Sequence, residues 1–336
     1  MTKMFAPHIH CDRSTPQIYL DVMVALLPCC AAAIYYYGIR ALILLLWGAT
    51  LFAFSDHFFT KYFRNENSGF DVSSIVSGTI LVLLLPPTVS IWTLSAGVLF
   101  SSIIVKQVFG GPGANIFNPA LAGRAFLAIA FSAQTSTYTA PLTGRLTGES
   151  LFIGPVDAID TISTVGESIS HSLLEVLSGA FPGAMGITGA IFALMGGLYL
   201  VTRGLLKLHA PIAYVLTIIA GYWLFFLGRA SLPDLASLLI MSGISFCAVF
   251  SLGDYSTTPT SRTGRVIFGI GAGVLALLFF AFGNSLFAIV FPVLVMNGVT
   301  PILDFYIRPR IFANKGWYYN EDNPPTQETS ETEVEA

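Results

Sequence analysis

Three aspartates stand within or beside strongly apolar stretches of this sequence. Asp21 falls in the first apolar stretch, Asp254 follows the eighth and Asp304 ends the tenth. A charge at the centre of a bilayer costs at least ~2.5 kcal/mol, so an intramembrane carboxylate indicates a functional site by default. The chemistry that such carboxylates offer is the binding of a cation or a proton. The alternative is an interfacial position, where Asp304 can pair with Arg308 one helical turn later.

Asn115 and Asn118 lie in "FGGPGANIFNPALAGRAF" (109–126), a stretch rich in glycine and proline between two apolar runs. Unpaired backbone amides and carbonyls are too costly at membrane depth unless they line a cavity or bind something. The stretch therefore predicts a re-entrant or broken-helix element in which Asn115 and Asn118 face a buried ligand or ion. An ordinary cytoplasmic turn, with Arg124 snorkelling to the interface, fits the composition equally well.

The composition places these residues in a membrane protein. Of the 336 residues, 54% are hydrophobic and 10% are charged, whereas a soluble domain carries about 25% charged residues. The net charge of −3 and the dispersed basic residues argue against nucleic-acid binding. No pair of the four cysteines has the C-x-x-C spacing of a metal or redox site, and no metal site is predicted, including at the "HIHC" cluster of residues 8–11.

The pattern of apolar runs predicts an all-α integral membrane protein with about ten transmembrane helices. These runs lie near 18–37, 39–60, 72–86, 90–108, 119–134, 184–202, 209–228, 235–252, 264–282 and 284–305. With the N-terminus inside, thirteen of the 16 Lys and Arg residues fall on one face. The positive-inside rule then predicts that both termini are cytoplasmic.

Five helices, a loop and five more helices indicate two repeats, and an odd number per half forces the halves into opposite orientations. Breaks at matching places support this: "LLLPPTVSIW" corresponds to "FSLGDYSTTPTSR", and "GANIFNPALAGRAF" to "FPVLVMNGVTPILDF". Interrupted helices in inverted halves point to a site near the bilayer midplane. The predicted parts are a cytoplasmic N-terminal segment (1–17), a first half (18–134), an external loop (135–183), a second half (184–312) and an acidic, disordered cytoplasmic tail (313–336).

Four long motifs carry a resemblance to a known family: "PHIHCDRSTPQIYLDVMVALLP", "VKQVFGGPGANIFNPALAGRAF", "SLGDYSTTPTSRTGRVIFGIGAG" and "VMNGVTPILDFYIRPRIF". The chain resembles the D subunits of the Rnf complex, the ion-pumping ferredoxin:NAD oxidoreductase, which are similar to NqrB of the sodium-pumping NADH:quinone oxidoreductase. The resemblance runs from about His8 to Phe312, and the short N-terminal region favours the Rnf type. It implies a subunit of the bacterial inner membrane that carries electrons through flavin while the complex, with subunits A, B, C, E and G, moves Na⁺ or H⁺.

The resemblance also implies covalent FMN, with room for a second flavin such as riboflavin. In this family a flavin transferase esterifies FMN through its phosphate to a threonine on the outer loop before the sixth helix. Here that loop reads "GPVDAIDTISTVGE", and an ungapped alignment puts Asp157 at the motif's Asp and Ser163 at the acceptor, with Thr161 and Thr164 beside it. Three positions depart from the motif, and Ile187 stands where relatives tend to carry an acidic residue. Attachment at Ser163 or Thr164 and simple helix capping both stay open.

Two other functions are compatible with these patterns. A cofactor-free transporter or channel for a small neutral solute fits the inverted ten-helix plan, and a structural scaffold fits a chain that has lost its flavin. The chain lacks a G-x-G-x-x-G fingerprint after a strand and a cysteine array for an iron–sulfur cluster, so it is expected to work as a translocase subunit and not to catalyse alone. Lys106 and Arg124 are expected to attract anionic lipid or a flavin phosphate.

Overall fold

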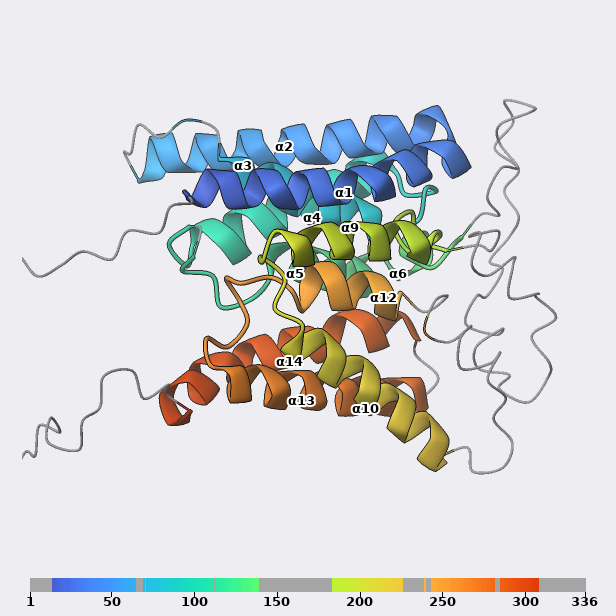
Figure 1. Ribbon diagram of the computed structural model, residues 1–336. Coiled ribbons are helices and arrows are strands. Elements are labelled where there is room, and N and C mark those ends of the chain that lie inside the picture. Colours follow the sequence, from blue (N-terminus) through green and yellow to red (C-terminus); the bar gives the residue numbers. More distant parts are fainter. Residues whose placement is uncertain are drawn as a thin grey trace, which may run out of the picture.

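The computed structural model describes residues 14–64, 69, 71–111, 113–138, 183–225, 239, 243–281 and 285–307. Every regular element in these residues is a helix, and the helices run side by side across Figure 1. Four of them are long and apolar enough to cross a membrane: α1 (Thr15–Tyr37), α2 (Ile39–Phe63), α13 (Arg262–Ala281) and the Ala288–Tyr306 part of α14 (Ser285–Tyr306). The described part of the chain is therefore an all-helical membrane protein.

Shorter helices fill the remaining apolar stretches. They are α3 (Val72–Leu83), α4 (Ile91–Leu99) with its π-helical continuation η1 (Phe100–Gln107), α5 (Pro119–Ala130), α6 (Ser132–Thr135), α9 (Ala190–Thr202), α10 (His209–Phe225), and α12 (Ile244–Phe246) with its π-helical continuation η2 (Cys247–Ser251). α3 stops before the two consecutive prolines at 86 and 87, which cannot continue a helix. α5 begins at a proline behind an asparagine cap, a favoured start.

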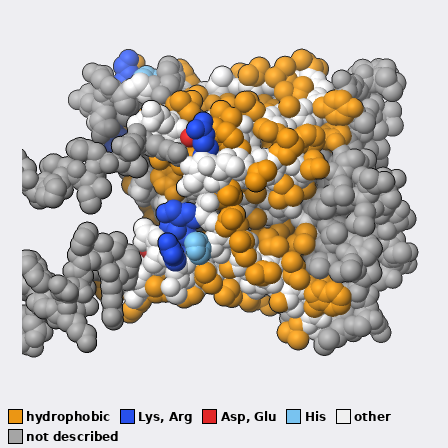
Figure 2. Space-filling view, in the orientation of Figure 1, with side chains coloured by type: hydrophobic (Ala, Val, Ile, Leu, Met, Phe, Trp, Pro, Cys, Tyr) orange, Lys and Arg blue, Asp and Glu red, His pale blue; other side chains and the backbone are white. Residues whose placement is uncertain are grey.

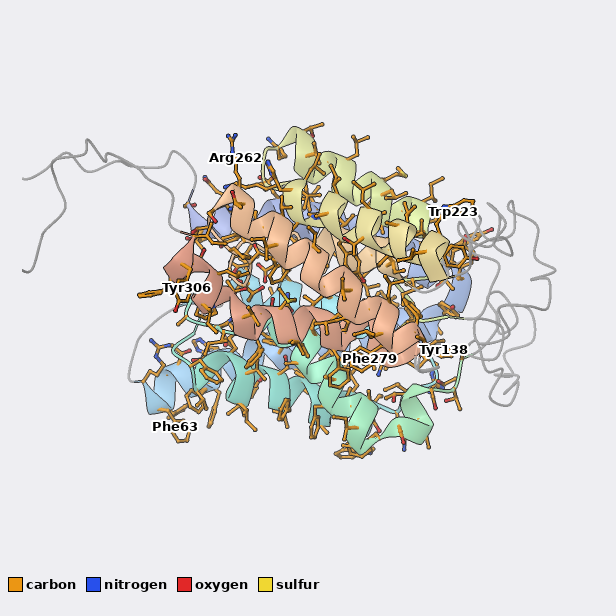
Figure 3. All side chains as sticks on the ribbon, turned by 90° about the horizontal axis from the view of Figure 1, so that it is seen from below. Phe63, Tyr138, Trp223, Arg262, Phe279 and Tyr306 are labelled. Carbon is orange, nitrogen blue, oxygen red and sulfur yellow. The ribbon has the colours of Figure 1, made fainter. Side chains whose placement is uncertain are left out.

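The helices end at two opposite ends of the bundle. Phe63, Arg262 and Tyr306 lie at one end of the bundle, whereas Tyr138, Trp223 and Phe279 lie toward the other (Figure 3). The end of α2, the beginning of α13 and the end of α14 therefore share one end of the molecule.

The break after α3 lies inside the protein, and the segment before α9 satisfies its backbone. The amide of Gly186 donates to the carbonyl of Leu83 at 2.7 Å, and the amide of Met185 donates to the carbonyl of Leu85 at 3.1 Å. A helix leaves its last carbonyls without intrahelical partners, and an unpaired carbonyl is costly in an apolar interior. Residues 183–189 thus remove that cost.

Two arginines satisfy further carbonyls of the same break. Arg124 is 1% exposed, and its Nε donates to Leu84 O at 2.9 Å while its Nη2 donates to Thr135 O at 3.3 Å. Arg40 Nε donates to Pro87 O at 2.6 Å. The expectation that Arg124 snorkels to an interface or attracts lipid is therefore wrong, because its guanidinium is fully enclosed and binds backbone carbonyls.

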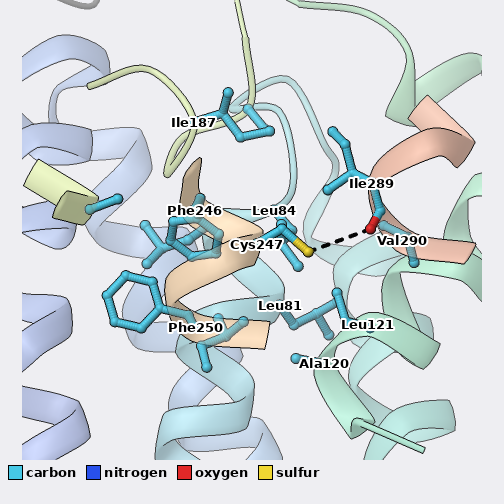
Figure 4. Packing of buried hydrophobic residues seen from close by; sticks show 14 of the residues in the cluster. Leu81, Leu84, Ala120, Leu121, Ile187, Phe246, Cys247, Phe250, Ile289 and Val290 are labelled. Atoms are coloured by element: carbon cyan, nitrogen blue, oxygen red, sulfur yellow. Dashed lines mark hydrogen bonds between the residues drawn. The ribbon is translucent and has the colours of Figure 1, made fainter. Parts of the chain in front are cut away.

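The core of the molecule surrounds α12 and η2. Phe246, Cys247 and Phe250 are at most 4% exposed, and the Cys247 thiol donates to the carbonyl of Ile289 at 3.5 Å (Figure 4). Ile187 belongs to this apolar cluster. An acidic residue at position 187 would have to be buried here, so the local surroundings suit isoleucine.

A close approach of α1 and α9 depends on Gly196. A Cβ at this position would overlap the backbone carbonyl oxygen of Ala25, which cannot swing away as a side chain can. We expect Gly196→Ala to lower the free energy of unfolding by about 1–3 kcal/mol. Gly298 in α14 is the matched control, because its nearest neighbour, a Phe117 ring carbon, would lie 3.6 Å from the new Cβ.

The control should keep or raise stability, because alanine is the better helix former by ~1 kcal/mol. Thermal melts of the purified protein in detergent would compare the two variants. Equal shifts of the melting temperature would show that the α1–α9 contact tolerates a side chain.

Candidate functional site

A cavity of ≈ 60 Å³ lies beside the points where the chain leaves η1 and η2. It has room for a few water molecules or a partly hydrated ion, since a water needs about 10–15 Å³ by this measure. Both halves of the chain form its walls. The polar side chains most relevant to binding are Ser73, Lys106, Asn115, Asn118, Asp254 and Ser256.

Asp254 follows η2, is partly buried and lines the cavity. Its carboxylate accepts hydrogen bonds from Ser256 N at 3.1 Å and Ser256 Oγ at 3.0 Å, from Thr257 Oγ1 at 3.3 Å and from Asn118 Nδ2 at 3.2 Å. All of these donors are neutral, and Asp254 makes no ion pair with any described residue. The geometry therefore leaves a negative charge that a bound cation or a proton can neutralise.

Asn118 connects the start of α5 to this carboxylate. Its Oδ1 accepts from the amides of Ala120 at 3.1 Å and Leu121 at 3.3 Å, which caps the helix, while its Nδ2 donates to Asp254 across 136 positions of sequence. One side chain thus fixes the start of α5 relative to the segment that follows η2.

Asn115 supplies an acceptor that is not used. The side chain is 9% exposed and lines the cavity, and its Oδ1 has no hydrogen-bond partner among the described residues. A buried polar atom of this kind is costly unless water or an ion meets it. Around it the chain forms a glycine turn, with positive φ at Gly110, Gly111 and Gly113. The stretch is therefore a turn whose second part packs inward.

Asn297 in α14 joins the start of α5 and the segment after η2 a second time. The sequence analysis did not select this residue as a site candidate. It is fully buried, and its amide, oriented to suit both neighbours, donates to Thr257 O at 3.3 Å and accepts from Asn118 N at 3.1 Å. An asparagine in the middle of an apolar run, "VLVMNGV", was the available signal.

Lys106 occupies the opposite wall of the cavity within a buried cluster. Its Nζ lies 3.2 Å from Asp56 Oδ2 and 3.1 Å from Asp71 Oδ2, and it donates to Ser73 Oγ at 2.8 Å and Ser74 Oγ at 2.6 Å. The side chain is 1% exposed. The expectation that Lys106 attracts lipid or a flavin phosphate is therefore wrong, because two carboxylates already hold its ammonium group.

Asp56 and Asp71 were also missed from the sequence. Asp56 lies inside the apolar range 39–60, so the argument that selected Asp21 would have selected it too. Asp71 caps the start of α3. Burial alone would raise the pKa of Asp71, but the Lys106 ammonium and the hydrogen bonds from Ser73 hold that pKa below its ordinary value.

The other two predicted carboxylates lie away from the cavity. Asp21 accepts from the hydroxyl of Tyr199 at 2.9 Å and lies 3.4 Å from Nε of Arg203. Asp304 accepts from the amide of Thr260 at 2.9 Å and from its hydroxyl at 3.0 Å. The structure thus brings Asp254 together with Asn115 and Asn118, and leaves Asp21 and Asp304 in local contacts of their own.

Five sequence-predicted residues fall outside the described part of the chain. They are the four residues of the flavin-attachment loop, Asp157, Thr161, Ser163 and Thr164, and the proposed partner of Asp304, Arg308.

Comparison with known proteins covers nearly the whole chain. Residues 2–313 match the family described as NQR2, RnfD, RnfE. The chain belongs to this family. The segments that follow η1 and η2, and every residue that lines the cavity, lie within the part that matches the NQR2, RnfD, RnfE family.

Individual relatives are similar to this chain over more than nine tenths of their own length. The chain is 31% identical over 314 residues to the D subunit of the Na⁺-translocating ferredoxin:NAD⁺ oxidoreductase complex of Acetobacterium woodii, covering 93% of this chain and 95% of the relative. It is 32% identical over 330 residues to the D subunit of the ion-translocating oxidoreductase complex of Stutzerimonas stutzeri, covering 89% and 92%. The corresponding D subunit of Salmonella typhimurium is 29% identical over 346 residues, covering 92% and 97%.

Proposed function

We propose that this chain is the D-type membrane subunit of an Rnf-type complex, which couples electron transfer between ferredoxin and NAD to translocation of Na⁺ or H⁺. Family membership and the names of the relatives support this function. The structural observation that carries it is the Asp254 carboxylate, which faces a cavity and has no cationic partner among the described residues. The transported ion binds at Asp254 on its way through the subunit.

The charges around the cavity favour a cation. Asp254, Asp56 and Asp71 carry three negative charges. Among the described residues, Asp56 and Asp71 share one cation, Lys106. Because the surroundings are mostly apolar, this excess negative charge acts on a cation in the cavity with little screening. The unused Oδ1 of Asn115 adds an oxygen ligand, the type that a hard cation such as Na⁺ takes.

The packing of the helices supports two inverted five-helix halves around this site. α1 packs on α9 and α5 packs on α14, so the first helices of the two halves meet and so do the last. In both halves the second helix packs on the fourth, α2 on α4 and α10 on α13, and the fourth packs on the fifth, α4 on α5 and α13 on α14. We extend the proposal to ten membrane-crossing segments in the inner membrane, with both termini in the cytoplasm.

The electron carrier in this proposal is FMN, held through a phosphoester at Ser163 or Thr164 and attached by a flavin transferase. Subunits A, B, C, E and G are the proposed partners, and a second flavin can be shared with them. The degenerate motif makes the acceptor hydroxyl the first point to test.

We expect the chain, coexpressed with a flavin transferase, to give a fluorescent band on a denaturing gel. Ser163→Ala or Thr164→Ala, whichever removes the acceptor hydroxyl, should abolish the fluorescence, because no phosphoester can form without it. Intact-mass measurement would check that the mass falls by one FMN. A dark wild-type band with the mass of the bare chain would rule out covalent attachment.

The function as a whole is tested in inverted membrane vesicles. Vesicles with the complete complex should take up Na⁺ or H⁺ when reduced ferredoxin and NAD⁺ are supplied, and vesicles without this chain should not. Solute uptake by the chain alone, independent of ferredoxin and NAD⁺, would favour the cofactor-free transporter instead.

A further inference from the structure

An apolar groove runs along the outer surface between α10 and α13. Its volume is ≈ 540 Å³. It is lined by seven residues between Leu208 and Ala220, in α10 and just before it, and by Val266 and Ile270 of α13. Ile212, Leu216 and Ile270 are 40–60% exposed in it. The two helices come very close together at Gly269, where a Cβ would overlap the carbonyl oxygen of Ala210.

A cluster of cations lies at one end of this groove. Lys207 precedes α10, and Arg262 and Arg265 form the first turn of α13. Figure 2 shows Lys and Arg side chains with a His beside them at the left end of the apolar surface, and His209 is a groove residue. Burial lowers the pKa of Lys207, and the charges of the nearby Arg265 and Arg262 lower it further.

The acidic groups near this cluster do not neutralise it. Asp304 acts on Arg265 and offsets only part of the charge of the three cations, while its carboxylate accepts hydrogen bonds from the neutral Thr260. None of the three cations makes an ion pair with a described residue. Cations that repel one another at the mouth of an apolar groove favour a ligand with an anionic head and an apolar tail.

We propose that this groove binds one anionic phospholipid, with its headgroup on Lys207, Arg262 and Arg265 and an acyl chain between α10 and α13. Basic pockets between membrane helices bind acidic lipid headgroups in this way. The site is separate from the Asp254 cavity, because the two share no lining residue. Loss of this lipid and loss of ion binding are therefore distinguishable.

Native mass spectrometry of the delipidated complex, titrated with phosphatidylglycerol or with phosphatidylcholine of the same acyl chains, would test the proposal. The wild type should bind one phosphatidylglycerol more tightly than phosphatidylcholine. Lys207→Gln should weaken the binding of that phosphatidylglycerol by about fivefold, which is the effect of one basic residue at a membrane surface. The same substitution should leave phosphatidylcholine binding unchanged. Ala220→Phe, which fills the groove without changing charge, should weaken it as well.

Lys61→Gln is the matched control, because Lys61 is an exposed lysine at the same end of the molecule and lies outside the groove. It should change phosphatidylglycerol affinity less than about twofold, since it is remote from the headgroup site. Equal affinities in wild type, Lys207→Gln and Lys61→Gln would overturn the proposal. So would efficient cross-linking of an Ile212→Cys variant to another subunit of the complex, because a protein helix would then occupy the groove.

Discussion

Replacing Asp254 by asparagine is expected to lower ion uptake by the assembled complex by about 30-fold or more. Asparagine has nearly the same shape and can keep bonds to Ser256 and Thr257, so the local fold should persist. What it lacks is the one carboxylate charge in the cavity that no described cation offsets. A cation or proton that binds there loses most of its attraction, and translocation slows.

The measurement is ion uptake by inverted vesicles supplied with reduced ferredoxin and NAD⁺, normalised to the amount of assembled complex. Asp304→Asn is the matched control, because Asp304 lies away from the cavity and bonds Thr260. It should retain at least half of the wild-type rate. Normal uptake in Asp254→Asn, or an equal loss in both variants, would contradict the role assigned to Asp254.

Replacing Lys106 by methionine is expected to lower the free energy of unfolding by about 3–5 kcal/mol, the cost of breaking a buried ion pair by removing one partner. Methionine fills nearly the same space, so little of the effect comes from a cavity. The loss arises because the buried carboxylate of Asp56 and the partly exposed carboxylate of Asp71 are left without their shared cation. Thermal melts in detergent and the yield of assembled complex would measure it.

The double variant Lys106→Met, Asp56→Asn separates charge from packing. Removing the more deeply buried of the two carboxylates should recover part of the lost stability, since the two effects are coupled. Asp56→Asn alone should cost less than Lys106→Met, because Lys106 then keeps Asp71 as its partner. Additive losses in the double variant would show that the cluster contributes packing and not charge balance.

The sequence by itself determined the class of protein and the positions of its helices. Apolar runs of sufficient length can only be helices in a membrane, because every backbone group must be paired within the segment. A described helix overlaps each predicted range, and some of the helices stop where proline or glycine forces a break, as α3 does before residues 86 and 87. The long motifs also identified the family, which the match over residues 2–313 confirms.

Only the tertiary structure decided which polar groups meet. The sequence marks Asp21, Asp254 and Asp304 alike, as carboxylates beside apolar runs, because hydropathy reports that a group is near the membrane but not what lies opposite. Helix packing places Asp254 against Asn118, 136 residues away. The same packing encloses Lys106 and Arg124, which by residue type alone look like loop cations. A buried charge is tolerable only with the right partners, and those partners come from other helices.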